Sequence, residues 1–209
     1  LRGLKVGGDD EEELFAGNPG LAYVKQTKQG FAAYSGGVVG GTAWLFTLPE
    51  WEGQLDFLFV DEAGQVSLAN TIATARSAKN IILLGDQMQL EQPIQGAHPG
   101  ESGLSGLQYA LKDLALSKPD DPAFHAVVPA DYGLFLGESR RMHPAICSFI
   151  SESVYEGRLG AFVDCGKQRI AVPPKGAKLV QKENGIFFSP IEHDGNIQQS
   201  DEDVARVLD

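Results

Sequence analysis

The segment Leu55–Asn70 contains a short apolar run that ends in two adjacent acids. Residues 55–60 are almost continuously apolar, and Asp61 and Glu62 follow directly. A near-continuous apolar run of this length is typical of a strand buried on both faces of a parallel sheet. Ligands of open parallel sheets bind just outside the carboxyl ends of the strands. The segment therefore indicates both a fold, a parallel α/β sheet, and a position for its chemistry.

A second apolar run at 80–84 ends at Gly85 and Asp86. Between the two runs, residues 67–78 predict a helix with Leu68, Ile72 and Ala75 on one face. Two strands separated by a helix of this length form a βαβ unit, for which a right-handed crossover is expected.

The rest of the chain predicts further elements and a division into two domains. The expected elements are an irregular segment or short helix at 1–30, a strand with a Gly-rich turn at 38–46, loops at 91–103 and 164–184, helices at 105–116 and 144–155, strands at 133–136 and 185–191, and a helix that starts at 200–203 and is capped by Ser200. The Pro- and Asp-containing stretch 117–122 is typical of a linker. We therefore expect a first domain over 1–117, a linker over 118–132 and a second domain over 133–209.

Length and composition exclude several classes of protein. The chain has 209 residues, of which 43% are hydrophobic, enough for one domain or parts of two with a sizeable core. It has no apolar run of about 18 residues, so no membrane span or membrane partner is expected. Its first residues lack the pattern of a signal peptide. Two cysteines are too few for a disulfide framework or a metal cluster, so a reducing, cytoplasmic location is expected.

The net charge of −11 argues against a nucleic-acid-binding protein if charge alone is considered. A soluble acidic domain is the plainer interpretation. Much of the acid, however, is concentrated at 9–13 and 201–203. A negative net charge therefore does not exclude a local basic groove.

The acids that follow the first strand are candidates for metal and water chemistry. Asp61 would hold Mg²⁺ through water, and Glu62 would orient or deprotonate an attacking water. The alternative is two acids that open a surface loop. Gln89, three residues after Asp86, suits a neutral contact with a γ-phosphate, and the alternative there is a polar turn.

Two arginines, Arg140 and Arg141, precede the helix predicted at 144–155. A guanidinium stays charged and binds phosphate oxygens bidentately, so it can neutralise charge on a transferring phosphoryl group. The alternative is a pair of surface arginines before a helix.

The three clusters together resemble motifs II, III and IV of the superfamily 1 helicases, in that order. DEAGQ at 61–65 resembles the Walker B motif, LLGDQMQL at 83–90 resembles the GDxxQL motif, and RRMHP at 140–144 resembles the arginine-finger motif. VVGGTAWLF at 38–46 resembles motif Ic, which contacts nucleic acid. Within the superfamily, the chain resembles the Upf-like/Dna2-like branch, particularly bacterial proteins that join a RecB-type nuclease to such a helicase.

The resemblance implies a RecA-like parallel sheet flanked by helices, the fold of P-loop NTPases, with part of a second RecA-like domain. It implies that ATP, with Mg²⁺, is hydrolysed between the two domains to drive movement along single-stranded nucleic acid. DNA is the expected substrate and 5′→3′ the implied direction. A nuclease domain fused outside this chain is a further implication.

The resemblance also implies roles for individual residues. These are Asp61 as the magnesium acid, Glu62 as the catalytic base, Gln89 as the γ-phosphate sensor with Asp86 beside it, Arg141 as the arginine finger, and Thr42 as a contact with the strand backbone. The family often has Gln-Tyr before Arg-Met-His-Pro, whereas Ser139-Arg140 stands here. Arg140 is therefore the candidate for the nucleotide contact that this Gln makes.

The chain contains no G-x-x-x-x-G-K-[ST] phosphate loop. We therefore expect an internal fragment of a longer enzyme, which alone does not hydrolyse ATP at a helicase-like rate. Two other functions stay open: an ATP-driven clamp or switch on nucleic acid without unwinding, and a binding module with an inactive ATPase site.

Several other residues have plainer interpretations. The histidines lack metal-ligand spacing and are expected in structural or solvent-facing positions: His98, His125, His143 and His193. Cys147 is expected in the core. Trp44 is interpreted as a core residue, with base stacking as the alternative.

Overall fold

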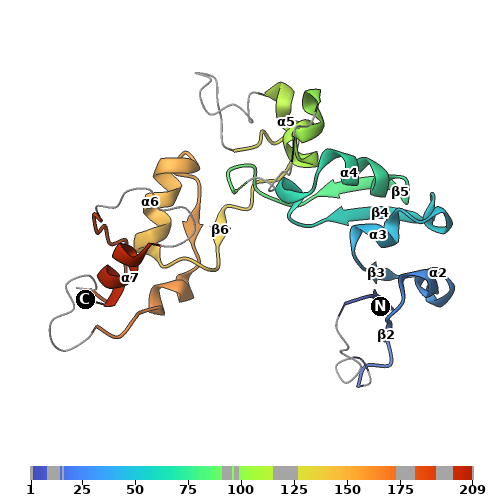
Figure 1. Ribbon diagram of the computed structural model, residues 1–209, viewed down its shortest axis with the longest axis horizontal. Helices are drawn as coiled ribbons and strands as arrows, with labels where there is room; N and C mark the ends of the chain where they lie inside the picture. Colours follow the sequence, from blue (N-terminus) through green and yellow to red (C-terminus); the bar gives the residue numbers. More distant parts are fainter. Residues whose placement is uncertain are drawn as a thin grey trace. The chain divides into compact units, whose positions relative to one another are not determined.

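The computed structural model describes residues 2–8, 15, 17–90, 96, 99–114, 127–172, 182–191 and 200–208 (Figure 1). The chain divides into two compact units, residues 1–124 and 125–209. The division falls inside the stretch 118–132 that was predicted as a linker, of which residues 118–126 lie outside the described residues.

The first unit begins with a parallel sheet of three short strands. They are β1 (Gly3–Val6), β2 (Leu21–Val24) and β3 (Val38–Gly40), in the order β2-β1-β3. The prediction of an irregular segment or short helix at 1–30 is therefore wrong, because β1 and β2 lie there. Each of these strands has only four residues. In β1, buried Leu4 and Val6 alternate with less buried residues, too short a pattern to identify a strand from sequence.

A second parallel pair joins β4 (Leu55–Val60) and β5 (Ala78–Leu83), with helix α4 (Leu68–Ala75) between them in the chain. The predicted bounds of β4 are confirmed, whereas β5 begins two residues earlier and ends one residue earlier than predicted. Helix α4 begins after Ser67, whose hydroxyl accepts from the N–H of Asn70 at 3.2 Å. Parallel strands with intervening helices are compatible with the predicted α/β class.

The expected burial of β4 on both faces is wrong. Leu55 and Leu58 are buried, but Phe57 and Phe59 are 55% and 62% exposed. Both side chains therefore remain largely uncovered in the described part of the chain.

The predicted apolar face of α4, which carries Leu68, Ile72 and Ala75, is not the face that the helix buries most. The helix buries Thr71 and Thr74, whereas Ile72 is exposed. The threonine hydroxyls donate to helix carbonyls: Thr71 Oγ1 to the oxygen of Ser67 at 3.1 Å, and Thr74 Oγ1 to that of Asn70 at 2.8 Å. Since these hydroxyls are satisfied within the helix, threonine can face the interior without an unpaired polar group.

The core of the first unit joins the two sheets and the short helices around them. Its buried members are Leu4, Val6, Leu45, Trp51 and Leu55. Trp51 follows Pro49 in the 3-10 turn η2 (Pro49–Trp51) and is completely buried against three aromatic rings, those of Phe31, Tyr34 and Phe46. These rings come from two segments, α2 with its C-cap and α3, so Trp51 packs the two segments together.

Short helices flank this core. They are η1 (Thr27–Gln29), α2 (Gly30–Ala33) and α3 (Ala43–Phe46). The strand predicted at 38–46 therefore ends at Gly40, and residues 43–46 form a helix. Leu45 of α3 is buried, but Trp44 is 73% exposed. The interpretation of Trp44 as a core residue is wrong.

The first unit ends with η4 (Gly100–Gly103), α5 (Gly106–Leu111) and η5 (Lys112–Leu114). A capping box starts α5: the Ser105 hydroxyl accepts from the N–H of Gln108, whose side chain accepts from the N–H of Ser105. This confirms the start of the helix predicted at 105–116, whose last two residues lie outside the described part. Most of the loop predicted at 91–103 also lies outside it.

The second unit contains a parallel pair, β6 (Glu138–Ser139) and β7 (Gly160–Ala161), with α6 (Pro144–Val154) between them in the chain. Helix α6 ends one residue before its predicted end and has Pro at its first position, as predicted. The elements η6 (Val163–Lys167) and α7 (Asp201–Leu208) follow. The predicted cap of α7 is confirmed, because the Ser200 hydroxyl accepts from the N–H of Asp203 at 3.1 Å.

Two predictions of strands in this unit are wrong. Residues 133–136 and 185–191 form no strand, and the strand before α6 is at Glu138–Ser139 instead. Apolar side chains suggested strands there, but Leu134 and Phe188 are 90% and 89% exposed. Apolar character without a pairing partner does not make a strand. No described helix has the length and apolar character needed to cross a membrane.

Candidate functional site

The carboxyl ends of β4 and β5 are joined by backbone hydrogen bonds. The N–H of Leu84 donates to the carbonyl oxygen of Val60, and the N–H of Ala63 donates to that of Leu84, each at 2.8 Å. The second bond lies beyond the end of β4, so it holds the acidic segment 61–63 against the end of β5. The structure thereby brings the predicted Walker B and GDxxQL segments together.

Two glycines allow the segments to approach this closely. A Cβ on Gly64 would lie 2.8 Å from the carbonyl oxygen of Asp86, and a Cβ on Gly85 would lie 2.9 Å from the nitrogen of Ala63. Side chains do not approach backbone atoms this closely, so glycine is required at both positions. Neither residue was among the predicted site residues, although Gly64 lies within DEAGQ and Gly85 lies within LLGDQMQL.

Asp61 and Glu62 are both exposed at this edge. The Asp61 carboxylate accepts one hydrogen bond, from the N–H of Glu62 at 3.0 Å. Glu62 has φ 50° and ψ 42°, the left-handed region that a residue with a side chain occupies at a penalty of about 1–2 kcal/mol. The other described non-glycine residue with positive φ, Glu156, follows the last turn of α6, where this conformation is common. The backbone strain at Glu62 lies instead at the end of a strand, within the candidate site.

A tight turn orders Asp86 and Gln89. The Asp86 carboxylate accepts from the N–H of Met88 at 2.9 Å and from the Gln89 side-chain amide at 3.3 Å. The N–H of Gln89 donates to the Asp86 carbonyl at 3.4 Å. The two predicted residues are therefore in contact. Both Asp86 carboxylate oxygens accept hydrogen bonds, and one of these bonds orients the exposed Gln89 amide.

The donor set suits a metal that keeps most of its water. Among the described residues, no group of three His, Cys, Asp or Glu side chains could enclose a metal ion. Mg²⁺, however, commonly takes one or two carboxylates and several waters. Asp61 Oδ2 and the Glu62 carboxylate accept no hydrogen bond from the described part of the chain. These exposed oxygens fit a magnesium ion held through water.

The predicted arginine motif forms a turn that leads into α6. The Ser139 hydroxyl accepts from the N–H groups of Arg141 at 3.4 Å and Met142 at 3.2 Å. His143 is the N-cap residue of α6, and its Nδ1 accepts from the N–H of Ala145 at 3.1 Å. The expected structural role of His143 is thus confirmed.

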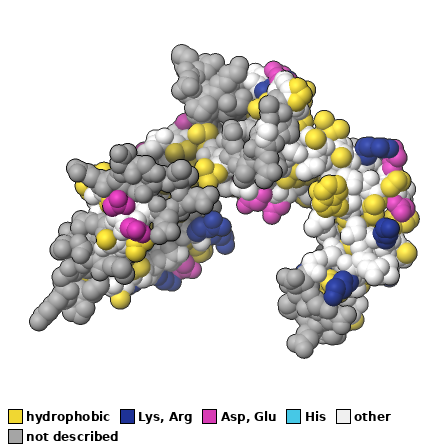
Figure 2. Space-filling view, in the orientation of Figure 1, with side chains coloured by type: hydrophobic (Ala, Val, Ile, Leu, Met, Phe, Trp, Pro, Cys, Tyr) yellow, Lys and Arg dark blue, Asp and Glu magenta, His cyan; other side chains and the backbone are white. Residues whose placement is uncertain are grey.

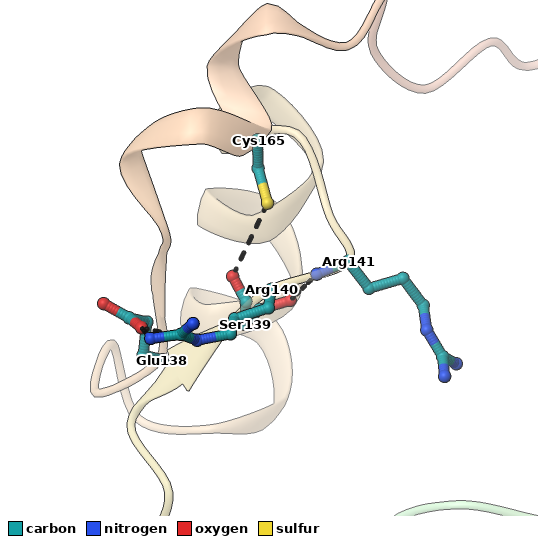
Figure 3. Close-up of polar contacts among 5 residues, drawn as sticks. All are labelled: Glu138, Ser139, Arg140, Arg141 and Cys165. Atoms are coloured by element: carbon teal, nitrogen blue, oxygen red, sulfur yellow. Dashed lines mark hydrogen bonds and ion pairs between the residues drawn. The ribbon is translucent and has the colours of Figure 1, made fainter. Parts of the chain in front are cut away.

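The two arginines have different environments (Figure 3). Arg140 turns back to Glu138, with its Nε 3.2 Å from the carboxylate, and its guanidinium lies over the Phe162 ring at 4.5 Å. Arg141 extends away from this cluster. Its guanidinium forms no ion pair with any described residue. The structure therefore leaves Arg141 available for an anionic ligand and engages Arg140 within its own unit.

Thr42, the predicted nucleic-acid contact, is exposed at the N-cap of α3. Its backbone is extended and its hydroxyl makes no capping hydrogen bond. The hydroxyl is therefore not committed to holding the helix.

Both cysteines are buried and reduced, which confirms the expected core position of Cys147. Burial raises the pKa of the Cys147 thiol, and the nearby Cys165 raises it further. The Cys165 sulfur lies 3.9 Å from the carbonyl oxygen of Ser139, so it packs against the arginine motif (Figure 3).

Known proteins offer a partial match. No protein-family model matches the chain. The chain is 30% identical over 118 residues to the DNA replication ATP-dependent helicase/nuclease DNA2 of Gallus gallus. The matched region is 56% of this chain and 10% of that protein, so the chain spans about a tenth of the length of the curated relative it matches. The similarity supports a helicase-like relationship.

Proposed function

We propose that this chain is part of an ATP-dependent superfamily 1 helicase of the Upf-like/Dna2-like branch, with a RecA-like fold. In this proposal, ATP hydrolysis drives movement along single-stranded nucleic acid, with DNA as the expected substrate. The observation that carries the proposal is the bonded pair of strand ends, which places Asp61-Glu62 beside Asp86-Gln89. The similarity to a DNA replication helicase/nuclease supports it independently.

The residues at the strand ends divide the chemistry between them. Asp61, whose Oδ2 is free within the described chain, would hold Mg²⁺ through water. Bound Mg²⁺ neutralises charge on the nucleotide phosphates. Glu62 would accept a proton from the attacking water. Its exposed carboxylate and strained backbone support this assignment.

Gln89 would distinguish a triphosphate from a diphosphate through its amide, because an amide binds phosphate without adding charge. The Asp86 hydrogen bond would hold the amide in place. Arg141 would stabilise charge on the transferring phosphoryl group, since its guanidinium has no other partner in the described chain. Arg140 would contribute less to nucleotide binding than Arg141, since Glu138 and Phe162 already engage it.

The Glu62→Gln substitution tests the proposal in a full-length protein that carries this sequence. The change keeps size and hydrogen-bonding capacity but removes the base. We expect nucleic-acid-stimulated ATP turnover to fall about 10²–10⁴-fold while ATP binding persists. Glu50→Gln is the matched control, because Glu50 is an exposed acid of the same unit away from the strand ends. Unchanged turnover in Glu62→Gln would remove Glu62 from the mechanism.

A strand-displacement assay separates unwinding from simpler ATP-driven binding. The wild-type protein is expected to separate a duplex with a single-stranded tail only when ATP is present. Stimulated ATPase without displacement would favour a clamp or switch over a helicase.

A further inference from the structure

Trp44 is an exposed aromatic side chain on a short helix that buries the neighbouring residue, Leu45. Its indole is 73% exposed, whereas the next residue, Leu45, is 1% exposed in the core. The other tryptophan, Trp51, is completely buried. Burial of an indole would stabilise the fold, so a tryptophan that stays exposed is a candidate for a binding surface.

The backbone under Trp44 is firmly held. Gly30, at the start of α2, packs against Leu45 so closely that a Cβ there would lie 3.0 Å from Leu45 Cδ1. At the other end of α3, the Thr47 hydroxyl donates to the carbonyl oxygen of Trp44 at 2.9 Å. A rigid support lowers the entropy that an aromatic side chain loses when it binds a flat partner.

Positive charge lies beside this helix. The turn η1 packs against α3 and belongs to the stretch 25–29, Lys-Gln-Thr-Lys-Gln, which has two lysines and no acid. Lys28 is exposed and forms no ion pair within the described part of the chain. In the space-filling view, hydrophobic side chains reach the surface of the first unit, next to Lys and Arg side chains that are interspersed with Asp and Glu side chains (Figure 2).

Two acids follow α3. Glu52 is paired with Arg76 at 2.7 Å, and Glu50 of η2 is exposed. The uncommitted hydroxyl of Thr42 stands two residues before Trp44. Among the described residues, an exposed aromatic face, a cation without an ion pair and a hydroxyl that makes no capping bond are thus carried by η1, α3 and the N-cap of α3.

We propose that Trp44 stacks on a base of single-stranded nucleic acid while Lys28 faces a neighbouring phosphate. Proteins that bind single strands without sequence preference combine these two contacts, since every base presents an aromatic face. The inference rests on the proposed nucleic-acid function and adds to it a site that binds bases by stacking, without sequence preference. It predicts binding to single strands in preference to duplex, in which the bases are already stacked.

Tryptophan fluorescence tests the contact directly, because the chain has only two tryptophans and one of them is buried. The 209-residue chain is titrated with an oligothymidylate of about 15 nucleotides, and binding is followed separately by anisotropy of a labelled oligonucleotide. Stacking should quench the Trp44 emission as the oligonucleotide binds. Trp44→Leu should abolish the quenching and weaken binding about 5- to 150-fold, and Trp44→Phe should recover part of the affinity.

Two further variants separate the contributions. Tyr132→Leu removes an aromatic ring of comparable exposure, 65%, and should leave affinity and quenching unchanged. Lys28→Ala should lower the slope of log affinity against log salt by about 0.7, the value for one phosphate contact on a single strand. Circular dichroism of each variant checks that the fold is intact.

The outcomes distinguish this inference from the proposed function. Binding without quenching, and with the same affinity in Trp44→Leu, would overturn the stacking site while leaving the helicase proposal intact. Absence of binding by the wild-type chain would also overturn the stacking site. The Glu62→Gln ATPase measurement decides the proposed function independently of either result.

Discussion

The backbone N–H of Ala63 donates a hydrogen bond of 2.8 Å to the carbonyl oxygen of Leu84. This single bond connects two motifs that are more than twenty residues apart in the chain, and the contacts of Gly64 and Gly85 surround it. The position of Asp61 and Glu62, the proposed magnesium acid and base, relative to Gln89, the proposed γ-phosphate contact, therefore depends on backbone packing at least as much as on the side chains themselves.

Replacing Gly64 with Ala should destabilise the first unit. The new Cβ would lie 2.8 Å from the Asp86 carbonyl oxygen, and since that atom belongs to the backbone, the two segments must separate. Overpacking of this kind typically lowers the free energy of unfolding by about 1–3 kcal/mol, which urea denaturation would measure. Gly40→Ala is the control, since a Cβ there has nothing within 4 Å. Equal losses in both variants would show that the close approach is unimportant.

Arg141→Ala should mainly lower ATP turnover, whereas Arg140→Ala should mainly lower stability. Loss of an arginine finger lowers ATP turnover by about 10³-fold or more, so Arg141→Ala should do so in the full-length protein without changing the melting temperature. Arg140→Ala should lower stability slightly, because it removes the contacts with Glu138 and Phe162, and should affect turnover less. ATPase assays and thermal melts of both variants provide the comparison. A larger loss of turnover in Arg140→Ala would reverse the two assignments.

The ion pair between Asp56 and Lys79 should make stability depend on pH. Lys79 lowers the pKa of the Asp56 carboxyl by a hydrogen bond of 2.8 Å and by its charge. The stabilisation is therefore present above the ordinary aspartate pKa and is lost as pH falls through the lowered pKa. Asp56 likewise raises the pKa of Lys79, so that contribution is present below the ordinary lysine pKa and is lost as pH rises through the raised value.

Melting temperatures of wild type and Asp56→Asn measured across the acid range test this sign. The wild type should melt slightly higher near neutral pH, and the difference should disappear in acid. The effect is small because both side chains are exposed. Lys79→Gln should show the same loss, whereas a difference that grows in acid would contradict the assignment.

Truncation of the two tryptophans should change the free energy of unfolding by very different amounts. Trp51→Ala opens a cavity among three aromatic rings and should lower the free energy of unfolding by about 3–5 kcal/mol. The Trp51 indole nitrogen is buried without a hydrogen-bond partner among the described residues, so Trp51→Phe should be much less damaging. Trp44→Ala should change stability by no more than about 0.5 kcal/mol. Comparable losses at both positions would place Trp44 in the core after all.

Local patterns in the sequence predicted the elements with the strongest signals. The apolar run before Asp61 predicted β4 with its observed bounds, and Pro144 correctly marked the first turn of α6. The polar residue types and their order also indicated a nucleotide chemistry. These features can be read from sequence because strand periodicity, capping and Pro geometry act over a few neighbouring residues.

Local patterns failed where a residue's environment depends on distant partners. The sequence predicted burial for Phe57 and Trp44, yet both are exposed, and it predicted a strand around Leu134, which has no pairing partner. The short strand β1 was missed because its stability comes from pairing with β2 and β3.

By itself, the sequence determined which acids, amides and arginines the protein has, their order, and the strand that carries Asp61 and Glu62. Only the tertiary structure decided that Gly64 and Gly85 let two motifs touch, that Arg140 is engaged while Arg141 has no ion pair among the described residues, and that Trp44 faces outward. The physical reason is range. Propensity and periodicity act between near neighbours, whereas close packing, burial and ion pairing are set by residues that only folding brings together.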